Sequence, residues 1–290
     1  MLWQHLINGL AQGSMYALLA VGFSLICGIM RKISFSHGEV FMVGAFAGLL
    51  VITELGQGLV VSILVAVGAA LLLGLITERI AFRPFVNDPD LTSALVTIGL
   101  SILLQNGVLL AFGADTKPFP LDTSGFTSQI GNVVVSGLDL SIFILAVGLI
   151  ALLQLFIHRT RWGLALRATA QNRDATSLMG IKPETAMVLT FALASILAGV
   201  DGLLVGIYYN AFYPRMGFII SLKALAAATL GGIGNVNGAV LGGLLLGLLE
   251  TMAVAFISTS YRDVIAFLIL ILVLLIRPAG LLGKPEEERA

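Results

Sequence analysis

Long apolar runs separated by short polar stretches make up most of this 290-residue chain. A helix needs about 20 apolar residues to cross the hydrocarbon core of a bilayer. Most runs reach or approach that length, although 37–53 is short and 218–257 is too long for one span. The glycine-rich sequence GGIGNVNG at 231–238 divides the long run, so we expect a short segment, a turn and a full helix there. The pattern predicts an all-α, polytopic transmembrane helix bundle of about nine spans, within a range of about eight to ten: 6–30, 37–53, 55–77, 91–114, 140–157, 185–209, 218–230, 239–257 and 264–276.

Composition supports an integral membrane protein. The chain is 58% hydrophobic and 11% charged, with a mean hydropathy of +1.02, whereas soluble domains are about 25% charged. A formal net charge of zero gives no basic patch for nucleic acid. The single cysteine, Cys27, excludes an intrachain disulfide and makes a cysteine-based metal site unexpected. No Lys or Arg precedes the first apolar run, so we interpret it as a retained helix of a single transmembrane domain, 1–290.

Basic residues indicate the orientation, because cytoplasmic loops are rich in Lys and Arg. With the N-terminus outside and the C-terminus cytoplasmic, the loop 115–139 is external and the loop 159–184 is cytoplasmic. An odd number of crossings is required by this arrangement. The basic residues that it places on the cytoplasmic side of the membrane are Arg31, Lys32, Arg79, Arg83, Arg159, Arg161, Arg167, Arg173, Lys182, Arg277, Lys284 and Arg289.

Glycines are abundant and several are spaced by four residues, including Gly9 with Gly13 and Gly44 with Gly48. Small residues at that spacing let transmembrane helices pack closely. The glycine-rich elements 34–48 and 218–243 have a second interpretation, because irregular backbone at membrane depth can line a pathway. In each half a long span precedes a short or broken one, and the predicted topology gives the two copies opposite directions. This is compatible with an inverted repeat with broken helices, a common transporter design.

Three ionisable residues lie inside predicted spans: Asp201, Lys223 and Glu250. Intramembrane charges are costly and are therefore functional candidates. The structural alternatives are an ion pair of Lys223 with Asp201 or Glu250, or a side chain that snorkels to the membrane interface. The chain has no metalloprotease, serine-hydrolase or P-loop motif, so we expect neither an enzyme nor a resident metal or cofactor. If transport is energised, the energy must come from another chain or from an ion gradient.

The segment RTRWGLALRATAQNRDATSLMGIKPET, 159–185, is polar and Arg-rich within an otherwise apolar chain. An amphipathic stretch at 164–172 precedes a short helical stretch that ends at Gly180, where a left-handed cap is expected. A solvated basic loop near anionic headgroups explains the charges. A compact helix and turn that fits a cytoplasmic partner also explains the small residues and the glycine.

The sequence RWGLALRATAQNRDATSLMGI resembles the cytoplasmic loop of permease subunits of bacterial ABC importers, whose pattern is E-A-A-x-x-x-G. This chain has Asp174-Ala175-Thr176 in place of E-A-A and keeps Gly180. The sequence GLAQGSMYALLAVGFSLICGIMRKISFSHGEVFMVGAFAG resembles the permeases of branched-chain amino acid (Liv-type) transporters. Their usual I-N-F-A-H-G-E has Ser34 and Ser36 here in place of Asn and Ala. The later sequence LGGIGNVNGAVLGGLLLGLLE is similar to their glycine-rich late segment.

This resemblance implies one of two permease chains that form a translocation pathway across a bacterial plasma (inner) membrane. The implied partners are a homologous second permease, two ATPase subunits and a periplasmic substrate-binding protein. ATP is then used by the partner subunits. The residues that the resemblance assigns to the coupling loop are Arg161, Gly163, Arg167, Arg173, Asp174, Ala175 and Gly180. Those that it places near the pathway are Phe35, His37, Glu39, Gly231, Gly232 and Asn235, for which a structural role is the alternative.

The implied substrates are branched-chain amino acids or related small polar solutes. Permeases of the same superfamily for urea, amides or sugars are the alternatives within transport. A self-sufficient channel or gradient-driven carrier is the alternative from another class, and it predicts uptake without ATPase subunits.

Overall fold

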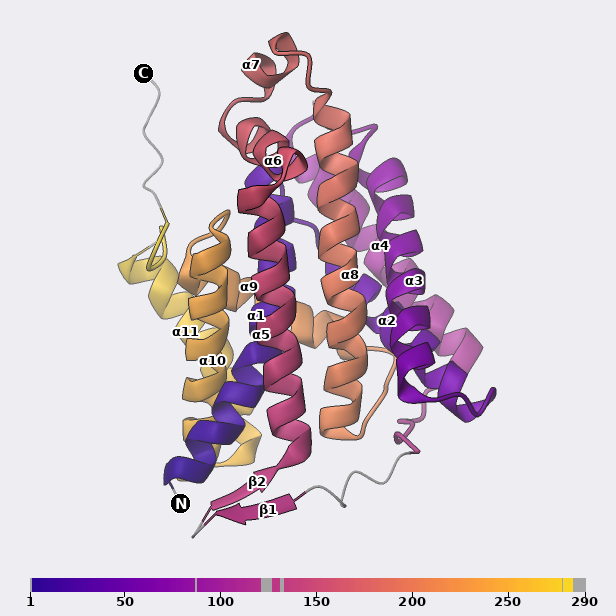
Figure 1. Cartoon of the computed structure of the whole chain (residues 1–290), viewed down its shortest axis with the longest axis vertical. Coiled ribbons are helices and arrows are strands. Elements are labelled where there is room, and N and C mark those ends of the chain that lie inside the picture. The colour runs from indigo at the N-terminus through magenta and orange to yellow at the C-terminus, as the bar shows by residue number, and fades with distance from the viewer. Residues whose placement is uncertain (1, 87, 121–126, 131–132, 278, 284–290) are drawn as a thin grey trace. The chain divides into compact units, whose positions relative to one another are not determined.

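A computed structural model describes residues 2–283 apart from 87, 121–126, 131–132 and 278 (Figure 1). The described chain is helical, as predicted, and its elements follow the apolar runs. The α-helices are α1 (Leu2–Met30), α2 (His37–Thr53), α3 (Leu59–Thr77), α4 (Asp90–Phe112), α5 (Gly137–Arg159), α6 (Arg161–Gln171), α7 (Arg173–Leu178), α8 (Pro183–Tyr209), α9 (Met216–Gly231), α10 (Val236–Phe256) and α11 (Arg262–Ile276). A π-helical turn (Glu78–Phe82) extends α3, and a 3-10 turn (Thr259–Tyr261) precedes α11.

One small element departs from the all-α prediction. Within the predicted loop 115–139, β1 (Thr127–Ile130) pairs antiparallel with β2 (Val133–Ser136). The run Val133-Val134-Val135 explains this, because β-branched residues favour extended backbone. Part of the predicted loop lies outside the described residues, as do Lys284 and Arg289.

Six helices in the described part of the chain are long and apolar enough to cross a membrane: α1, α3 with its π-helical turn, α4, α5, α8 and α10. Two shorter apolar helices, α2 and α9, have 17 and 16 residues. At 1.5 Å per residue each is about 25 Å long, slightly less than a hydrocarbon core of about 30 Å. Whether these short helices and α11 cross completely stays a prediction.

The chain forms two compact units. Unit 1 comprises Met1–Ser24, Asp122–Val147 and Leu222–Ala290, and unit 2 comprises Leu25–Leu121 and Gly148–Ser221. Three of the four boundaries therefore fall inside α1, α5 and α9, and the fourth lies between residues 121 and 122.

In unit 2, helices α2, α3 and α8 pack side by side (Figure 1). Small residues bring their backbones together, as the glycine spacing predicted. A Cβ on Gly44 would lie 2.9 Å from the Cα of Gly199, and a Cβ on Gly202 would overlap the carbonyl of Phe41. Gly48 packs against the side chain of Leu203 and the carbonyl of Ser62.

In unit 1, glycines join α1 to α10 and α9 to α10. Gly247 of α10 lies against the backbone of Gly13, and Gly242 lies against the carbonyl of Ala227. Gly234 has a different role, because it lies in the turn before α10 with a φ of +85°. Four-residue glycine spacing thus marks helix contacts in both units, except at this turn.

Candidate functional site

An irregular segment at residues 31–36 links α1 to α2 in unit 2. Arg31 has a φ of +56° and ends α1 in a left-handed cap, while Ser34 and Ser36 are fully buried. Lys32 is also buried, and its Nζ donates to the carbonyl oxygens of Phe85 and Asp88, both at 2.7 Å. The segment is therefore held by protein groups, which is what irregular backbone at membrane depth requires.

One face of α4 supplies most of the other partners of this segment. Ser93, Thr97, Ser101 and Gln105 recur every four residues and so share a face of the helix. Ser93 accepts from Lys32 at 3.2 Å, and Thr97 accepts from the N–H of Phe35 at 3.3 Å. Sequence analysis missed this polar stripe, although its four-residue spacing within an apolar span was a visible signal.

The last two residues of this stripe contact Glu39, which lies in the first turn of α2. Its Oε1 accepts from Ser101 Oγ and from Gln105 Nε2, both at 2.8 Å. Among the described residues its Oε2 has no hydrogen-bond partner, although the side chain is fully buried. Of the predicted pathway residues in unit 2, Phe35 and Glu39 are both tied to α4, and His37 begins α2.

The first turns of α2 and α9 meet within unit 2. A Cβ on Gly38 would overlap the carbonyl of Gly217, and a Cβ on Gly217 would overlap the carbonyl of Gly38. A Cβ on Gly217 would also lie 2.9 Å from Oε2 of Glu39. The two helices thus touch by backbone, with the free carboxylate oxygen beside the contact.

The connection from α1 to α2 and the connection from α8 to α9 have similar backbone geometry. Arg31 directly follows α1 and Asn210 directly follows α8, and both are left-handed, with φ of +56° and +48°. In each case the next short helix begins six residues later, at His37 and at Met216, and its second residue is the contacting glycine.

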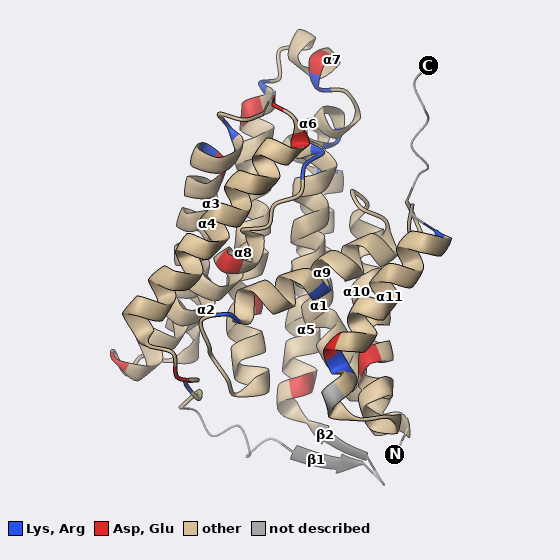
Figure 2. Cartoon of the chain, turned by 180° about the vertical axis from the view of Figure 1, so that it is seen from behind, with Lys and Arg blue, Asp and Glu red and all other residues tan. Residues whose placement is uncertain are grey.

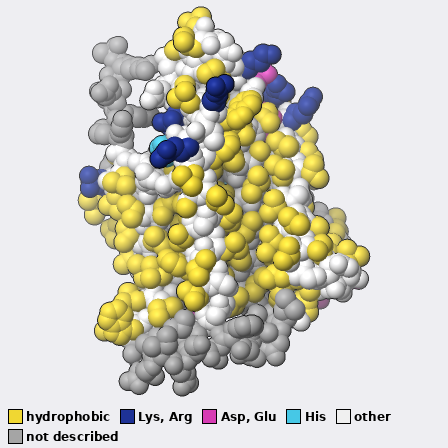
Figure 3. All heavy atoms as spheres, viewed as in Figure 1, with side chains coloured by type: hydrophobic (Ala, Val, Ile, Leu, Met, Phe, Trp, Pro, Cys, Tyr) yellow, Lys and Arg dark blue, Asp and Glu magenta, His cyan; other side chains and the backbone are white. Residues whose placement is uncertain are grey.

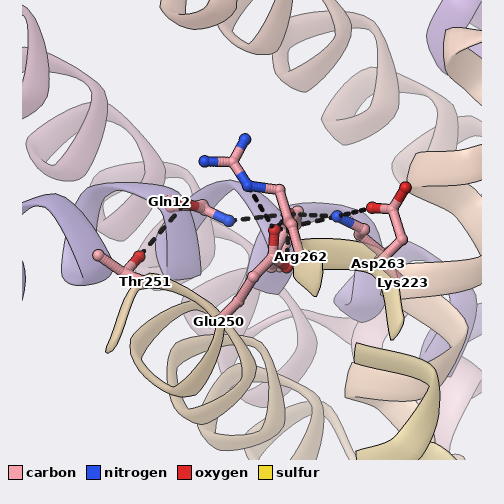
Figure 4. A network of polar contacts seen from close by, with 7 residues as sticks. Gln12, Lys223, Glu250, Thr251, Arg262 and Asp263 are labelled. Atoms are coloured by element: carbon pink, nitrogen blue, oxygen red, sulfur yellow. Dashed lines mark hydrogen bonds and ion pairs between the residues drawn. The ribbon is translucent and has the colours of Figure 1, made fainter. Parts of the chain in front are cut away.

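Unit 1 holds a network of charges around the buried pair Lys223 and Glu250, with Asp263 and Arg262 partly exposed (Figure 4). Lys223 of α9 contacts Glu250 of α10 at 3.0 Å and Asp263 of α11 at 2.7 Å. Tyr16 of α1 donates to both oxygens of Glu250, and Arg262 lies 3.3 Å from the same carboxylate. Sequence analysis considered Asp201 and Glu250 as partners of Lys223, and the structure pairs it with Glu250. The second ion pair, with Asp263, was missed.

Gln12 and Thr251 extend this network. Gln12 donates to the Tyr16 hydroxyl at 2.9 Å and accepts from Thr251 at 3.3 Å. Asp201 lies in unit 2 and is fully buried, and neither of its oxygens has a hydrogen-bond partner among the described residues.

The predicted coupling loop forms two short helices in unit 2. Thr160 caps α6 by accepting from Gly163, and Asn172 caps α7 by accepting from Ala175, both at 3.0 Å. Gly163 is buried against the backbone of Ile157. The predicted left-handed glycine is confirmed, because Gly180 has a φ of +81°.

One side of this loop packs on the unit and another is exposed. Leu166 is buried with Ile29 and Ala186, whereas Leu178 and Met179 beside Gly180 are 88% and 82% exposed. The remaining predicted loop residues lie on α6 or in the first turn of α7: Arg161, Arg167, Arg173 and Asp174. Lys and Arg segments gather at the α6 and α7 end of unit 2 (Figure 2).

The other predicted pathway residues lie in unit 1, at the turn between α9 and α10. Gly231 packs against Gly238, and Gly232 has a φ of +111°. Asn235 caps α10 by accepting from Asn237 and Gly238, and it donates to the carbonyl of Leu282 at 2.9 Å. These contacts give all three residues a structural role, and a role in the pathway stays a prediction.

Exposed apolar side chains cover the helices (Figure 3). Leu64 and Leu72 of α3 and Leu103 and Leu110 of α4 are each at least 65% exposed. Apolar faces of this kind, on helices long enough to span a bilayer, define a multi-pass helical membrane protein.

Residues 5–274 match the model of the family described as branched-chain amino acid transport system / permease component. The chain belongs to this family of ABC-transporter permeases, which are non-catalytic transmembrane subunits.

Two relatives illustrate the similarity. The chain is 40% identical to the high-affinity branched-chain amino acid transport system permease protein BraD of Pseudomonas aeruginosa, over 99% of this chain and 97% of the relative. It is 39% identical to LivH of Escherichia coli with the same coverage. Identity to the ribose import permease protein RbsC of Escherichia coli is 28%, over 94% of this chain and 85% of the relative.

One solved structure has a similar fold. PsaBC from Streptococcus pneumoniae in complex with Fab has a TM-score of 0.53 and 13% identity, covering 94% of this chain and 91% of that chain.

Proposed function

We propose that this permease carries branched-chain amino acids, or closely related small polar solutes, across a bacterial inner membrane. Support comes from the high-affinity branched-chain amino acid permeases, which are 38–40% identical over nearly the whole chain. The ribose permease is 28% identical, which makes a sugar the weaker alternative. Urea and amides remain alternatives within the same superfamily.

ATP hydrolysis by two separate ATPase subunits drives the cycle, and these subunits dock on α6 and α7. The observation that carries this part of the proposal is the exposed apolar tip, Leu178 and Met179, on an Arg-rich loop whose other side is anchored by Leu166. Exposed apolar patches rimmed by polar residues mark interaction sites. A rigid, anchored loop can transmit a movement of the ATPases because its contacts differ between two states of the pathway.

The remaining partners are a homologous second permease and a periplasmic substrate-binding protein. The basic residues at the α6 and α7 end of unit 2 support a cytoplasmic location for that end, with the N-terminus outside and the C-terminus cytoplasmic. About nine spans agree with six long helices together with α2, α9 and α11. The matched geometry after α1 and after α8 supports an internal repeat with broken helices.

Substitutions at Gly180 test the coupling loop. Valine is strained at a φ of +81°, whereas asparagine tolerates left-handed backbone. Neither side chain meets a clash, because no atom of the described structure lies within 4 Å of a Cβ at this position. We expect Gly180→Val to abolish uptake and to reduce co-purification of the ATPase subunits, and Gly180→Asn to retain most of both.

Membrane insertion, measured by the yield of folded protein in detergent, serves as the control and should be equal for both variants. If Gly180→Val retained normal uptake and normal ATPase co-purification, α7 would not be the coupling element.

A further inference from the structure

We propose that Glu39 and the first turns of α2 and α9 form the contact for the zwitterionic head of the transported amino acid. In this arrangement Glu39 receives the ammonium group, and the two helix N-termini receive the carboxylate. The inference rests on the proposed function, because it requires that the solute be an amino acid.

The first observation is the unequal environment of the two oxygens of Glu39. Ser101 and Gln105 both donate to Oε1, and Oε2 has no donor among the described residues. A buried acceptor without a partner loses the hydrogen bonds that water would give it, and the loss is larger for a charged group. An N–H-bearing ligand that donates to Oε2 offsets this cost.

The second observation is the pair of helix starts beside that oxygen. The first turn of a helix carries a partial positive charge. In α2 the N–H groups of His37 and Glu39 already donate to the carbonyl oxygens of Ser34 and Ser36, and in α9 that of Met216 donates to Tyr213, so the attraction for an anion is that of the positive helix ends. Both α2 and α9 begin here, at His37 and Met216, and their glycines at 38 and 217 leave no side chain between them. In transporters with broken helices, such N-termini point at anionic groups of the substrate.

Together these groups place both signs of charge within one small volume. The side chain of Glu39 provides the negative charge, and the two N-termini provide the positive charge. This combination matches a molecule that carries an ammonium and a carboxylate on the same carbon. A neutral sugar has neither group, so the site also explains a preference for amino acids.

The conformation described here is closed at this point. The backbones of Gly38 and Gly217 touch, and Glu39 is fully buried. Binding therefore requires that the first turns of α2 and α9 separate, which uncovers Oε2 of Glu39. Because the donors to Oε1 come from α4, the carboxylate stays in place when α9 moves away.

The test uses the complete transporter, with its partner permease, ATPase subunits and binding protein, in liposomes. Radiolabelled leucine uptake and ATP hydrolysis are measured together for the wild type, Glu39→Gln, Glu39→Asp and Glu54→Gln. Glu39→Gln should lower leucine uptake about tenfold or more, as expected for a lost hydrogen bond to a charged group. Hydrolysis stimulated by the binding protein should continue, so that less leucine is moved for each ATP.

Glu54→Gln is the matched control, because it makes the same substitution at an exposed carboxylate directly after α2. It should retain uptake close to the wild type, and Glu39→Asp, which keeps the carboxylate, should retain more uptake than Glu39→Gln. Normal uptake by Glu39→Gln would overturn the inference, as would equal losses in Glu39→Gln and Glu54→Gln. If Glu39→Gln does not assemble, an assembled Glu39→Asp variant without uptake would overturn it too. Failure of the wild type itself to take up leucine would instead contradict the proposed function.

Discussion

Lys223 illustrates how individual charged residues are accommodated in this protein. Its ammonium group has three neighbours within 3.4 Å: Glu250, Asp263 and Tyr16. The side chain is 5% exposed and that of Glu250 is fully buried. Taking two charges out of water is expensive, and good geometry with additional hydrogen bonds is what offsets the cost. The network therefore fits a structural role in joining α1, α9, α10 and α11.

Removing one member of this pair should destabilise the protein strongly. In Lys223→Met the carboxylate of Glu250 loses its most buried partner but keeps Tyr16 and Arg262, and we expect the free energy of unfolding to fall by about 2 kcal/mol. Adding Glu250→Gln removes the charge that has lost this partner and should recover part of that loss. Thermal unfolding in detergent measures both variants.

The result that would contradict this interpretation is normal stability of Lys223→Met combined with altered uptake. That result would place Lys223 in the translocation pathway.

Among the elements, α2 and α9 are distinguished by how closely their first turns approach. Gly38 and Gly217 are each in backbone contact with the other helix, so a methyl group at either position must push the helices apart. By contrast, Gly107 of α4 has no atom within 4 Å of an added Cβ. Gly38 and Gly107 therefore provide a matched pair of glycines in the same unit, one in close contact and one in open space.

We expect Gly38→Ala to lower the free energy of unfolding by about 2 kcal/mol, the cost of forcing extra volume into a packed contact. Gly107→Ala should be neutral or stabilising by up to about 1 kcal/mol, since alanine favours helix over glycine. Thermal unfolding of both variants checks this expectation. Equal stability of the two variants would show that α2 and α9 do not touch in the folded protein.

At the scale of the whole molecule, the apolar runs predicted most of the helices because a membrane span needs a long apolar segment. The left-handed Gly180 also followed from sequence, since a glycine that ends a helix is a strong local rule. Glu250 was one of two partners considered for Lys223, and sequence alone did not choose it over Asp201. The role of Ser101 and Gln105 did not, because hydropathy treats such residues as weakly polar and cannot identify their partner on another helix. The hairpin formed by β1 and β2 was missed because the turn-rich composition around it obscured four-residue strands.

The central claim is that this chain is a permease component of an importer whose energy comes from other subunits. Leucine uptake into liposomes measures it directly, with the permease alone under an ion gradient and with the ATPase subunits, second permease and binding protein plus ATP. We predict uptake only in the complete, ATP-supplied system, with leucine, isoleucine and valine preferred over urea and ribose. Leucine uptake by this chain alone under the ion gradient would contradict the account.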